Sequence, residues 1–306
     1  MIVLEKLVKP PVRKAPAGAF RYLWQRRWRM AKTFQTYDDL LIFLQNEKNL
    51  IIEDVEYARH ILAKTSYFSL ITGYKETFKN PTTGKYVDGT TFEDIYCLYQ
   101  FDNELRSIFL KYMLLAERNV KSSLAYHFSA TYGENQTEYL SLSHYMPTAS
   151  MQRGIQKLLR VFHYQLTYKN EHAYINHYKT KHHNVPLWIM VQVLTIGQLS
   201  FLSIMTKHRN VCAHGERFFN YATKDSITDT VIHRKLRILQ KNGRYQKGKN
   251  DIFSEIIILK YLLDEEDFRR FYYELKYCLK YHAPGERILA LMGFPKNWTA
   301  IIRLKC

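Results

Sequence analysis

Apolar residues recur at helical spacing along most of the chain. Between Thr90 and Phe128 they return every three or four positions, which predicts one or two long amphipathic helices. Further helices are expected over 36–44, 53–65, 151–168, 187–194, 252–263 and 268–281. Thr36 or Asp38 can cap the first of them. No repeated strand alternation occurs, so the fold class is mainly α, with one small hairpin near residues 80–90.

Polar residues interrupt the apolar pattern of the long segment. They are Asp102, Glu104, Arg106, Glu117, Arg118 and Lys121. Such residues could face a functional site. Surface ion pairs are the commoner explanation on an amphipathic helix, and we favour them here for all of these residues except Glu117.

Size and cysteine usage exclude several classes of protein. The chain has 306 residues, enough for a substantial core, and its best apolar run, Trp188–Leu194, is too short to span a bilayer. Lys6 and Lys9 interrupt any signal-peptide core. The four cysteines are scattered without a CxxC pair, which argues against zinc and against a disulfide framework. We therefore expect a cytoplasmic protein without membrane, metal or cofactor.

The net charge of +17 is concentrated in two segments. Residues 1–34 carry nine Lys and Arg against one acidic residue, and residues 207–249 carry eleven against three. A polyanion is the natural partner, and nucleic acid is favoured because neither segment forms a clear amphipathic membrane helix. In the second segment the candidate RNA-binding residues are Lys207, Arg217, Arg234, Lys235, Arg237 and Arg244.

Residues 1–34 are expected to form a basic arm, and residues 35–302 a helical domain. Prolines break regular structure in the arm, and aromatic residues then alternate with Arg21, Arg26, Arg27 and Arg29. Aromatic rings can stack on bases while arginines neutralise phosphates. The same pattern also fits a helix packed on the domain with its arginines in water.

The densest candidate chemistry lies in the segment 206–220. Arg209, Asn210 and His214 fall within six positions there. A histidine can transfer a proton near neutral pH, and an arginine can hold a phosphate, so this set suits RNA cleavage without a metal. On a helix Asn210 and His214 share a face, and the Asn210 amide could orient the ring. Gly215 is a plausible helix stop. The plainer alternative is a solvated basic face with a histidine at a helix end.

A second group of histidines lies between residues 169 and 184. His172, His177, His182 and His183 are not spaced as a tight ligand set and have no cysteine or carboxylate beside them. A basic loop is the preferred interpretation.

Several segments resemble the bacterial abortive-infection (Abi) proteins of the AbiD/AbiF type, which carry a HEPN-like domain. They lie within residues 32–302, at 35–39, 67–75, 89–96, 101–106, 186–188 and 194–200. The most specific is 209–217, which resembles the RN-x-x-A-H form of the HEPN Arg-x4–6-His signature. The family usually has an extra helical stretch after the position of Ser200, and this sequence lacks it.

The resemblance implies a HEPN-like multi-helix bundle and a metal-independent endoribonuclease. Two such motifs would meet across a homodimer and leave a 2′,3′-cyclic phosphate. His214 would be the acid or base, Arg209 would stabilise the phosphorane and Asn210 would orient groups. Glu117 resembles a helix carboxylate near that site. Some relatives associate with a structured small RNA, which could hold or regulate the protein.

Three functions follow from these patterns. The first is a HEPN ribonuclease toxin of anti-phage defence. The second is a non-cleaving RNA-binding module in which the motif binds RNA or supports the dimer. The third is a DNA-binding regulator, for which the sequence has no helix-turn-helix or zinc signature. Loss of cutting with retained binding in His214→Ala would separate the first from the second.

Overall fold

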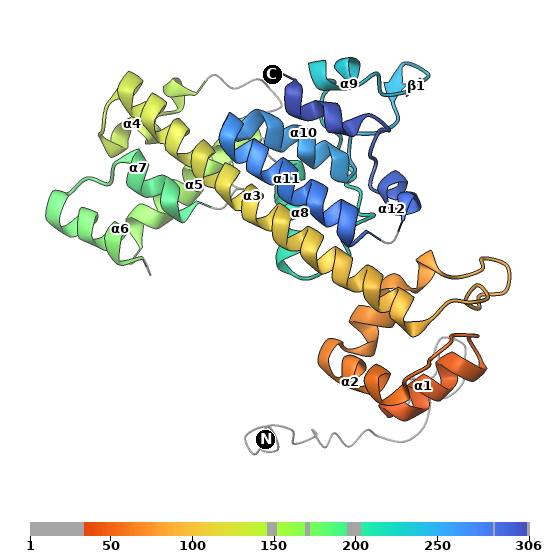
Figure 1. Ribbon diagram of the computed structural model, residues 1–306. Coiled ribbons are helices and arrows are strands. Elements are labelled where there is room, and N and C mark those ends of the chain that lie inside the picture. The colour runs from red at the N-terminus through yellow and green to blue at the C-terminus, as the bar shows by residue number, and fades with distance from the viewer. Residues whose placement is uncertain (1–33, 146–151, 169–171, 195–202, 284, 305–306) are drawn as a thin grey trace, which may run out of the picture.

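The computed structural model describes residues 34–145, 152–168, 172–194, 203–283 and 285–304, and it is mainly α-helical (Figure 1). The α-helices are α1 (Tyr37–Asn46), α2 (Val55–Thr65), α3 (Phe92–Tyr132), α4 (Gln136–Leu140), α5 (Gln152–Thr167), α6 (Ala173–His177), α7 (Leu187–Met190), α8 (Ser203–Ala213), α9 (Val231–Lys235), α10 (Ile252–Leu262), α11 (Glu265–Tyr281) and α12 (Glu286–Leu291). Short 3₁₀ or π turns cover 68–72, 75–77, 142–144, 178–182, 191–193 and 298–303. The predicted fold class is confirmed.

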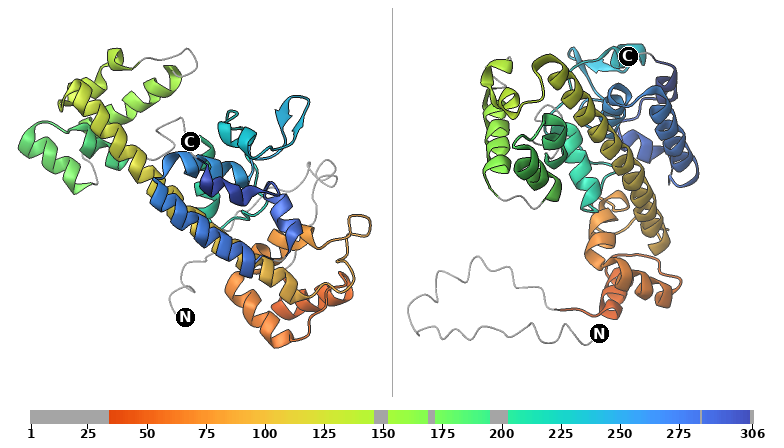
Figure 2. Two further views of the ribbon diagram at one scale, coloured as in Figure 1. Left: turned by 45° about the horizontal axis from the view of Figure 1, so that its top comes forward. Right: turned by 90° about the vertical axis from the view of Figure 1, so that its left-hand side faces the viewer.

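Helix α3 is the spine of the molecule. It is a single helix of 41 residues, so the segment predicted as one or two helices is one. Thr91 caps its start by accepting from the amide of Asp94, whose carboxylate accepts in return from the Thr91 amide. Gly133, with φ of 96°, ends it. In Figures 1 and 2, α10 and α11 run beside its middle, while α1 and α2 lie at one end and α4 to α7 at the other.

Two separate apolar clusters are built along this spine. The larger one includes side chains of α1, α2, α8, α10, α11 and the C-terminal segment, and its contribution from α3 ends at Ala116. The smaller one is formed by the 139–194 region, and α3 contributes Ala125 to it. The stretch of α3 between these two alanines is more polar, which keeps the clusters apart.

The helix ends follow the predicted chemistry. Thr36 caps α1 with a complete capping box to Asp39, as one of the two predicted caps. Helix α2 begins at Val55, two residues later than the pattern suggested, because Asp54 caps it. The apolar pattern predicted helix only as far as Phe128, but α3 continues through Tyr132 and α4 follows.

The small hairpin lies elsewhere than predicted. Near residues 80–90 there is one isolated antiparallel bridge, between Lys79 and Tyr86. The ladder is instead formed by β1 (Gln240–Lys241) and β2 (Arg244–Tyr245), joined by Asn242 and Gly243. Both turn residues have positive φ, as a two-residue hairpin turn of the primed type requires, and Asn-Gly is the preferred sequence for it.

Within the ranges given above, no helix combines the length and the apolar character that crossing a bilayer needs.

Candidate active site at the end of helix α8

Helix α8 carries the Arg-x4-His segment and is held between α3 and α10. Its inner face is formed by Ile204, Met205, His208, Val211 and Cys212, all buried. Burial raises the pKa of the Cys212 thiol, so this cysteine is held in its neutral, weakly nucleophilic form. The outer face belongs to the charged and polar residues of the motif.

The three predicted catalytic residues lie at the C-terminal end of α8. Asn210 and His214 are exposed, and Arg209 is partly buried. Nη1 of Arg209 donates to Oδ1 of Asn210 at 3.2 Å, while its Nε is shielded from solvent and has no partner in the described part of the chain. The Asn210 oxygen thus holds the arginine, and the orienting of the His214 ring by the Asn210 amide stays a prediction.

Gly215 ends the helix directly after His214, as predicted. Its φ of 67° lies in the left-handed region. The Gly215 amide donates to the carbonyl of Cys212, and the Glu216 amide donates to that of Val211. These two bonds form a Schellman motif, which fixes the direction in which the chain leaves the helix. The His214 backbone is thereby set in place while its side chain projects into solvent.

A buried carboxylate on α3 holds the loop that follows the motif. Oδ2 of Asp102 accepts from the Phe218 amide at 2.9 Å, and Oδ1 accepts from the Phe219 amide at 2.7 Å. The Tyr74 hydroxyl and the Arg106 guanidinium also donate to Oδ2, at 2.6 and 2.7 Å. Burial raises the pKa of Asp102, and Arg106 with these hydrogen bonds opposes that effect.

Two arginines complete the attachment of this loop. Nη1 of Arg106 donates to the Glu216 carbonyl at 3.1 Å, and Nη1 of Arg217 donates to the Gly73 carbonyl at 2.7 Å. Asp102 and Arg106 were expected to form surface ion pairs. That expectation is wrong, since their exposed fractions are 0% and 5%. They are buried because they satisfy backbone groups of a loop more than a hundred positions away in the sequence.

His208, directly before Arg209, forms a second buried polar pair. Its Nδ1 lies 2.7 Å from Oε2 of Glu255 on α10, and neither residue is exposed. The His208 ring also meets Phe218 and Tyr221 edge-on. Nε2 of His208 and Oε1 of Glu255 have no hydrogen-bond partner among the described residues. The pair fixes α8 against α10 at the turn that carries Arg209.

Glu117, the fourth predicted catalytic residue, lies in the polar stretch of α3 between the two clusters. It is 8% exposed and pairs with Lys121, four residues further along, at 2.8 Å. Its second oxygen has no partner in the described part of the chain. Its position beside the motif stays a prediction.

The predicted RNA-binding residues fall into three groups. Lys207 pairs with Asp225, and Arg217 holds Gly73 as described above. The second group lies on a peripheral unit in Figure 2, formed by α9 and the hairpin, that we call the basic lobe (residues 230–250). Its exposed members are Arg234, Lys235, Arg237 and Arg244. The sequence of this lobe contains no Asp or Glu. Arg21, Arg26, Arg27 and Arg29 lie outside the described residues.

His233 joins the beginning of the basic lobe to its end. Its Nδ1 accepts from the Thr230 amide at 3.0 Å, and its Nε2 donates to the Gly248 carbonyl at 2.8 Å. A backbone amide on one nitrogen and a carbonyl on the other require the neutral ring with the proton on Nε2. Burial lowers the pKa of His233, in agreement with that state.

Sequence reasoning missed the residues that position this site. Asp102, Arg106 and Glu255 each lie in a helical pattern that is otherwise apolar, and a charged residue on the inner face was the available signal. The partners could not be inferred, because they depend on contacts between distant segments. In the described ranges, no three His, Cys, Asp or Glu side chains gather as a metal-binding group.

One comparison with known proteins gives a match. Residues 60–205 match the family model described as Abi-like protein, so the match begins within α2 and ends within α8, before Arg209. No curated protein and no solved structure matches the chain. The matched segment lies inside the wider region, 32–302, over which the sequence resembles Abi proteins. Over residues 60–205 the chain is therefore similar to Abi-like proteins, and this likeness supports the Abi family.

Proposed function

We propose that the protein is a metal-independent endoribonuclease of abortive-infection defence, with Arg209, Asn210 and His214 as its catalytic residues. One observation carries the proposal. An exposed histidine and a partly exposed arginine project from the same end of helix α8. The Schellman motif fixes that helix end, the His208–Glu255 pair joins the helix to α10, and Asp102 holds the loop that follows. Preorganised groups of this kind suit catalysis of phosphoryl transfer.

The reaction uses the RNA's own 2′-hydroxyl. The 2′-oxygen gives up its proton and attacks the adjacent phosphorus, the bond from phosphorus to the 5′-oxygen breaks, and that oxygen takes a proton. The products are a 2′,3′-cyclic phosphate and a 5′-hydroxyl. His214 transfers a proton in this sequence, and the Arg209 guanidinium offsets the charge that develops on the phosphoryl oxygens. Asn210 keeps the guanidinium at the helix end through the 3.2 Å bond.

A homodimer would supply the second proton-transfer group. Each chain offers one Arg-x4-His segment, whereas the reaction needs a base and an acid. The exposed end of α8 leaves His214 accessible to the same segment of a second copy. RNA bound across the two copies would then meet one histidine on each side of the scissile phosphate.

The test is cleavage of purified RNA in EDTA by wild type, Arg209→Ala and His214→Ala. We expect cuts with 2′,3′-cyclic phosphate ends from the wild type and a loss of at least about a hundredfold in either variant. His60→Ala is the matched control, because His60 is an exposed helical histidine on α2, and it should cut as the wild type does. Equal cutting by His214→Ala would refute the catalytic assignment.

The basic lobe favours a second candidate function, that of an RNA-binding module which does not cut. Its exposed cations, without acidic neighbours in the segment, are what binding of a phosphate backbone requires. RNA retained by the wild type and by His214→Ala, with no cutting by either, would establish this function in place of the first. A structured small RNA would then be a bound partner instead of a substrate.

A further inference from the structure

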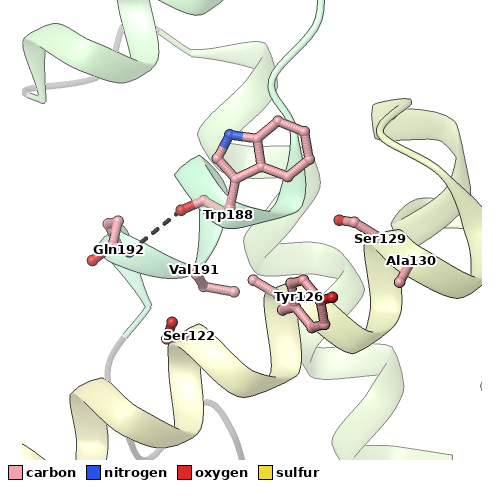
Figure 3. A pocket seen from close by; sticks show the side chains of 8 residues that line it. Ser122, Tyr126, Ser129, Ala130, Trp188, Val191 and Gln192 are labelled. Carbon is pink, nitrogen blue, oxygen red and sulfur yellow. Dashed lines mark hydrogen bonds between the residues drawn. The ribbon is translucent and has the colours of Figure 1, made fainter.

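A pocket of about 470 Å³ lies between the C-terminal half of α3 and the segment 187–193 (Figure 3). Small residues of α3 form one wall, and Trp188, Val191 and Gln192 form the other. The pocket exists because Ser122, Ala125, Ser129 and Ala130 leave room along the helix where larger side chains would fill it. Its size falls within the range of small-ligand sites.

Two aromatic rings stand on opposite sides of this pocket in Figure 3. Tyr126 is 71% exposed and Trp188 is 42% exposed. Exposed apolar rings that border a hollow together, instead of lying singly on the surface, are typical of ligand-binding grooves. The two rings favour a flat aromatic ligand, because aromatic side chains stack on such ring faces.

The polar groups of the pocket are neutral. The Ser129 hydroxyl oxygen is shielded from bulk solvent and has no hydrogen-bond partner in the described part of the chain, and Figure 3 shows it directed toward the space between the two rings. The Gln192 amide nitrogen donates to the Trp188 carbonyl at 3.3 Å. A hydroxyl and an amide can each donate and accept, which matches the edge of a nucleobase. Among the described residues none that lines the pocket is charged, so a charged ligand centre is disfavoured.

A cation lies just beyond the pocket. Arg118 is exposed one helical turn before Ser122 on the same face of α3, and it forms no ion pair with another described residue. If a base occupied the pocket, its sugar and phosphate would lie near the Arg118 guanidinium. The neighbouring Lys121 is already neutralised by Glu117. Arg118 therefore favours a nucleotide of a strand over an uncharged heterocycle.

We infer that this pocket binds one unpaired base of an RNA strand, with Tyr126 and Trp188 stacking on it and Ser129 and Gln192 bonding to its edge. The inference rests on RNA being the partner in the proposed function, and it adds the class of RNA. The strand must present an unstacked base, as a loop, bulge or single strand does, since a base inside a duplex cannot enter.

The test uses the full chain carrying His214→Ala, so that cutting does not disturb binding. The probe is a fluorescent six-nucleotide RNA with one central adenine among abasic positions, compared with the fully abasic chain by anisotropy. We expect the single base to raise the affinity about tenfold. Trp188→Leu, Tyr126→Leu and Ser129→Ala should each remove most of that gain and leave the affinity for the abasic chain unchanged.

Matched controls separate the pocket from the fold. Tyr261→Leu removes a tyrosine that is also exposed, on α10, and Ser123→Ala removes an exposed serine from α3, so both should keep the gain. Ser129→Ala removes an unpartnered hydroxyl and should not lower the thermal midpoint. Equal affinity for the two chains, or a gain unaffected by all three pocket variants, would overturn the inference.

Two further arms identify the source of the base and keep the proposals apart. Adenosine 5′-monophosphate that binds as tightly as the six-nucleotide chain would overturn the RNA assignment in favour of a free nucleotide. Absence of cleavage together with a pocket-dependent gain would sink the nuclease proposal and keep this one. Cleavage by the wild type, together with equal affinity for the abasic chain and the chain with one base, would keep the nuclease proposal and overturn the base-binding inference.

Discussion

His208 and Glu255 form a fully buried pair, with Nδ1 and Oε2 2.7 Å apart, one position before the arginine of the candidate site. The pair joins α8 to α10 through polar atoms in an otherwise apolar layer. Each residue keeps one polar atom without a partner in the described part of the chain. The contact therefore fixes the position of α8. Removing both side chains from water costs desolvation free energy, which is offset only while the two partners interact.

Removal of one member of this pair should destabilise the protein more than removal of both. Glu255→Met leaves the His208 imidazole buried without its partner, and we expect a loss of about 3–5 kcal/mol in the free energy of unfolding. His208→Leu combined with Glu255→Met should recover much of that loss, because both polar groups are gone. Urea unfolding of the wild type, both single variants and the double variant measures the difference. Strict additivity of the two single effects would contradict a coupled pair.

Asp102→Asn should release the loop that follows His214. Both carboxylate oxygens accept from backbone amides, so the side-chain amide of asparagine must turn its NH₂ toward an N–H donor in either orientation. Arg106 would also lose its buried counter-charge. We expect a loss of about 3–5 kcal/mol in the free energy of unfolding and lower cleavage.

The control for this substitution is Asp225→Asn, which breaks the solvent-exposed pair with Lys207. Its stability should stay close to that of the wild type, because water replaces the lost contact. If the two variants unfold at the same denaturant concentration, the buried carboxylate does not hold the loop in the way described.

Stability should fall as the pH is lowered through the histidine range, and His233 should carry part of the effect. Burial lowers its pKa in the folded protein, so the unfolded chain binds the proton more readily. This contribution is fully present above the unfolded pKa of about 6.5 and is lost as pH falls from there toward the lower folded value. Thermal midpoints at pH 5 to 8, for wild type and His233→Gln, measure it. An unchanged slope in the variant would exclude this role.

Two glycines with similar backbone angles should respond differently to alanine. At Gly215 nothing lies within 4 Å of the added Cβ, so only the positive φ opposes it, at about 1 kcal/mol. At Gly293 the added Cβ would overlap the Asp251 carboxylate that caps α10. Gly293→Ala should therefore lower the thermal midpoint far more than Gly215→Ala. Similar midpoints would show that the Asp251 contact is not tight.

The salt dependence of RNA affinity should locate the phosphate contacts. Arg234→Ala with Arg244→Ala removes two exposed cations of the basic lobe. If both contact phosphates of single-stranded RNA, the slope of log K against log salt should become shallower by about 1.4. The same two substitutions made at Arg269 and Arg270, which pair with acidic residues on α11, serve as the control and should not change the slope.

Local rules predicted the elements of this fold well. The period of the apolar residues gave α3, Thr36 marked the start of α1, and Gly215 marked the end of α8. These signals depend on residues a few positions apart. The hairpin was expected near residues 80–90 although Asn242 and Gly243 hold the sequence that such turns prefer.

The tertiary contacts that hold the candidate site in place could not be predicted from residues close together in the sequence. Asp102 is shared between Arg106, four positions away, and Phe218 and Phe219, which lie on a distant loop. A helix pattern shows only that a charge falls on or near the inner face, and surface pairing is the commoner outcome. The decisive fact is which backbone amides need an acceptor, and that depends on tertiary contacts.

The division of α3 between two clusters has a consequence for how the molecule opens. The clusters share no side chain of the stretch between Ala116 and Ala125, so the α4–α7 end can lose its packing while the larger cluster stays intact. Amide hydrogen exchange should then report two cooperative units with different opening free energies. The pocket of Trp188 belongs to one unit and His214 to the other, so the end that holds the pocket can open locally while the surroundings of His214 stay folded.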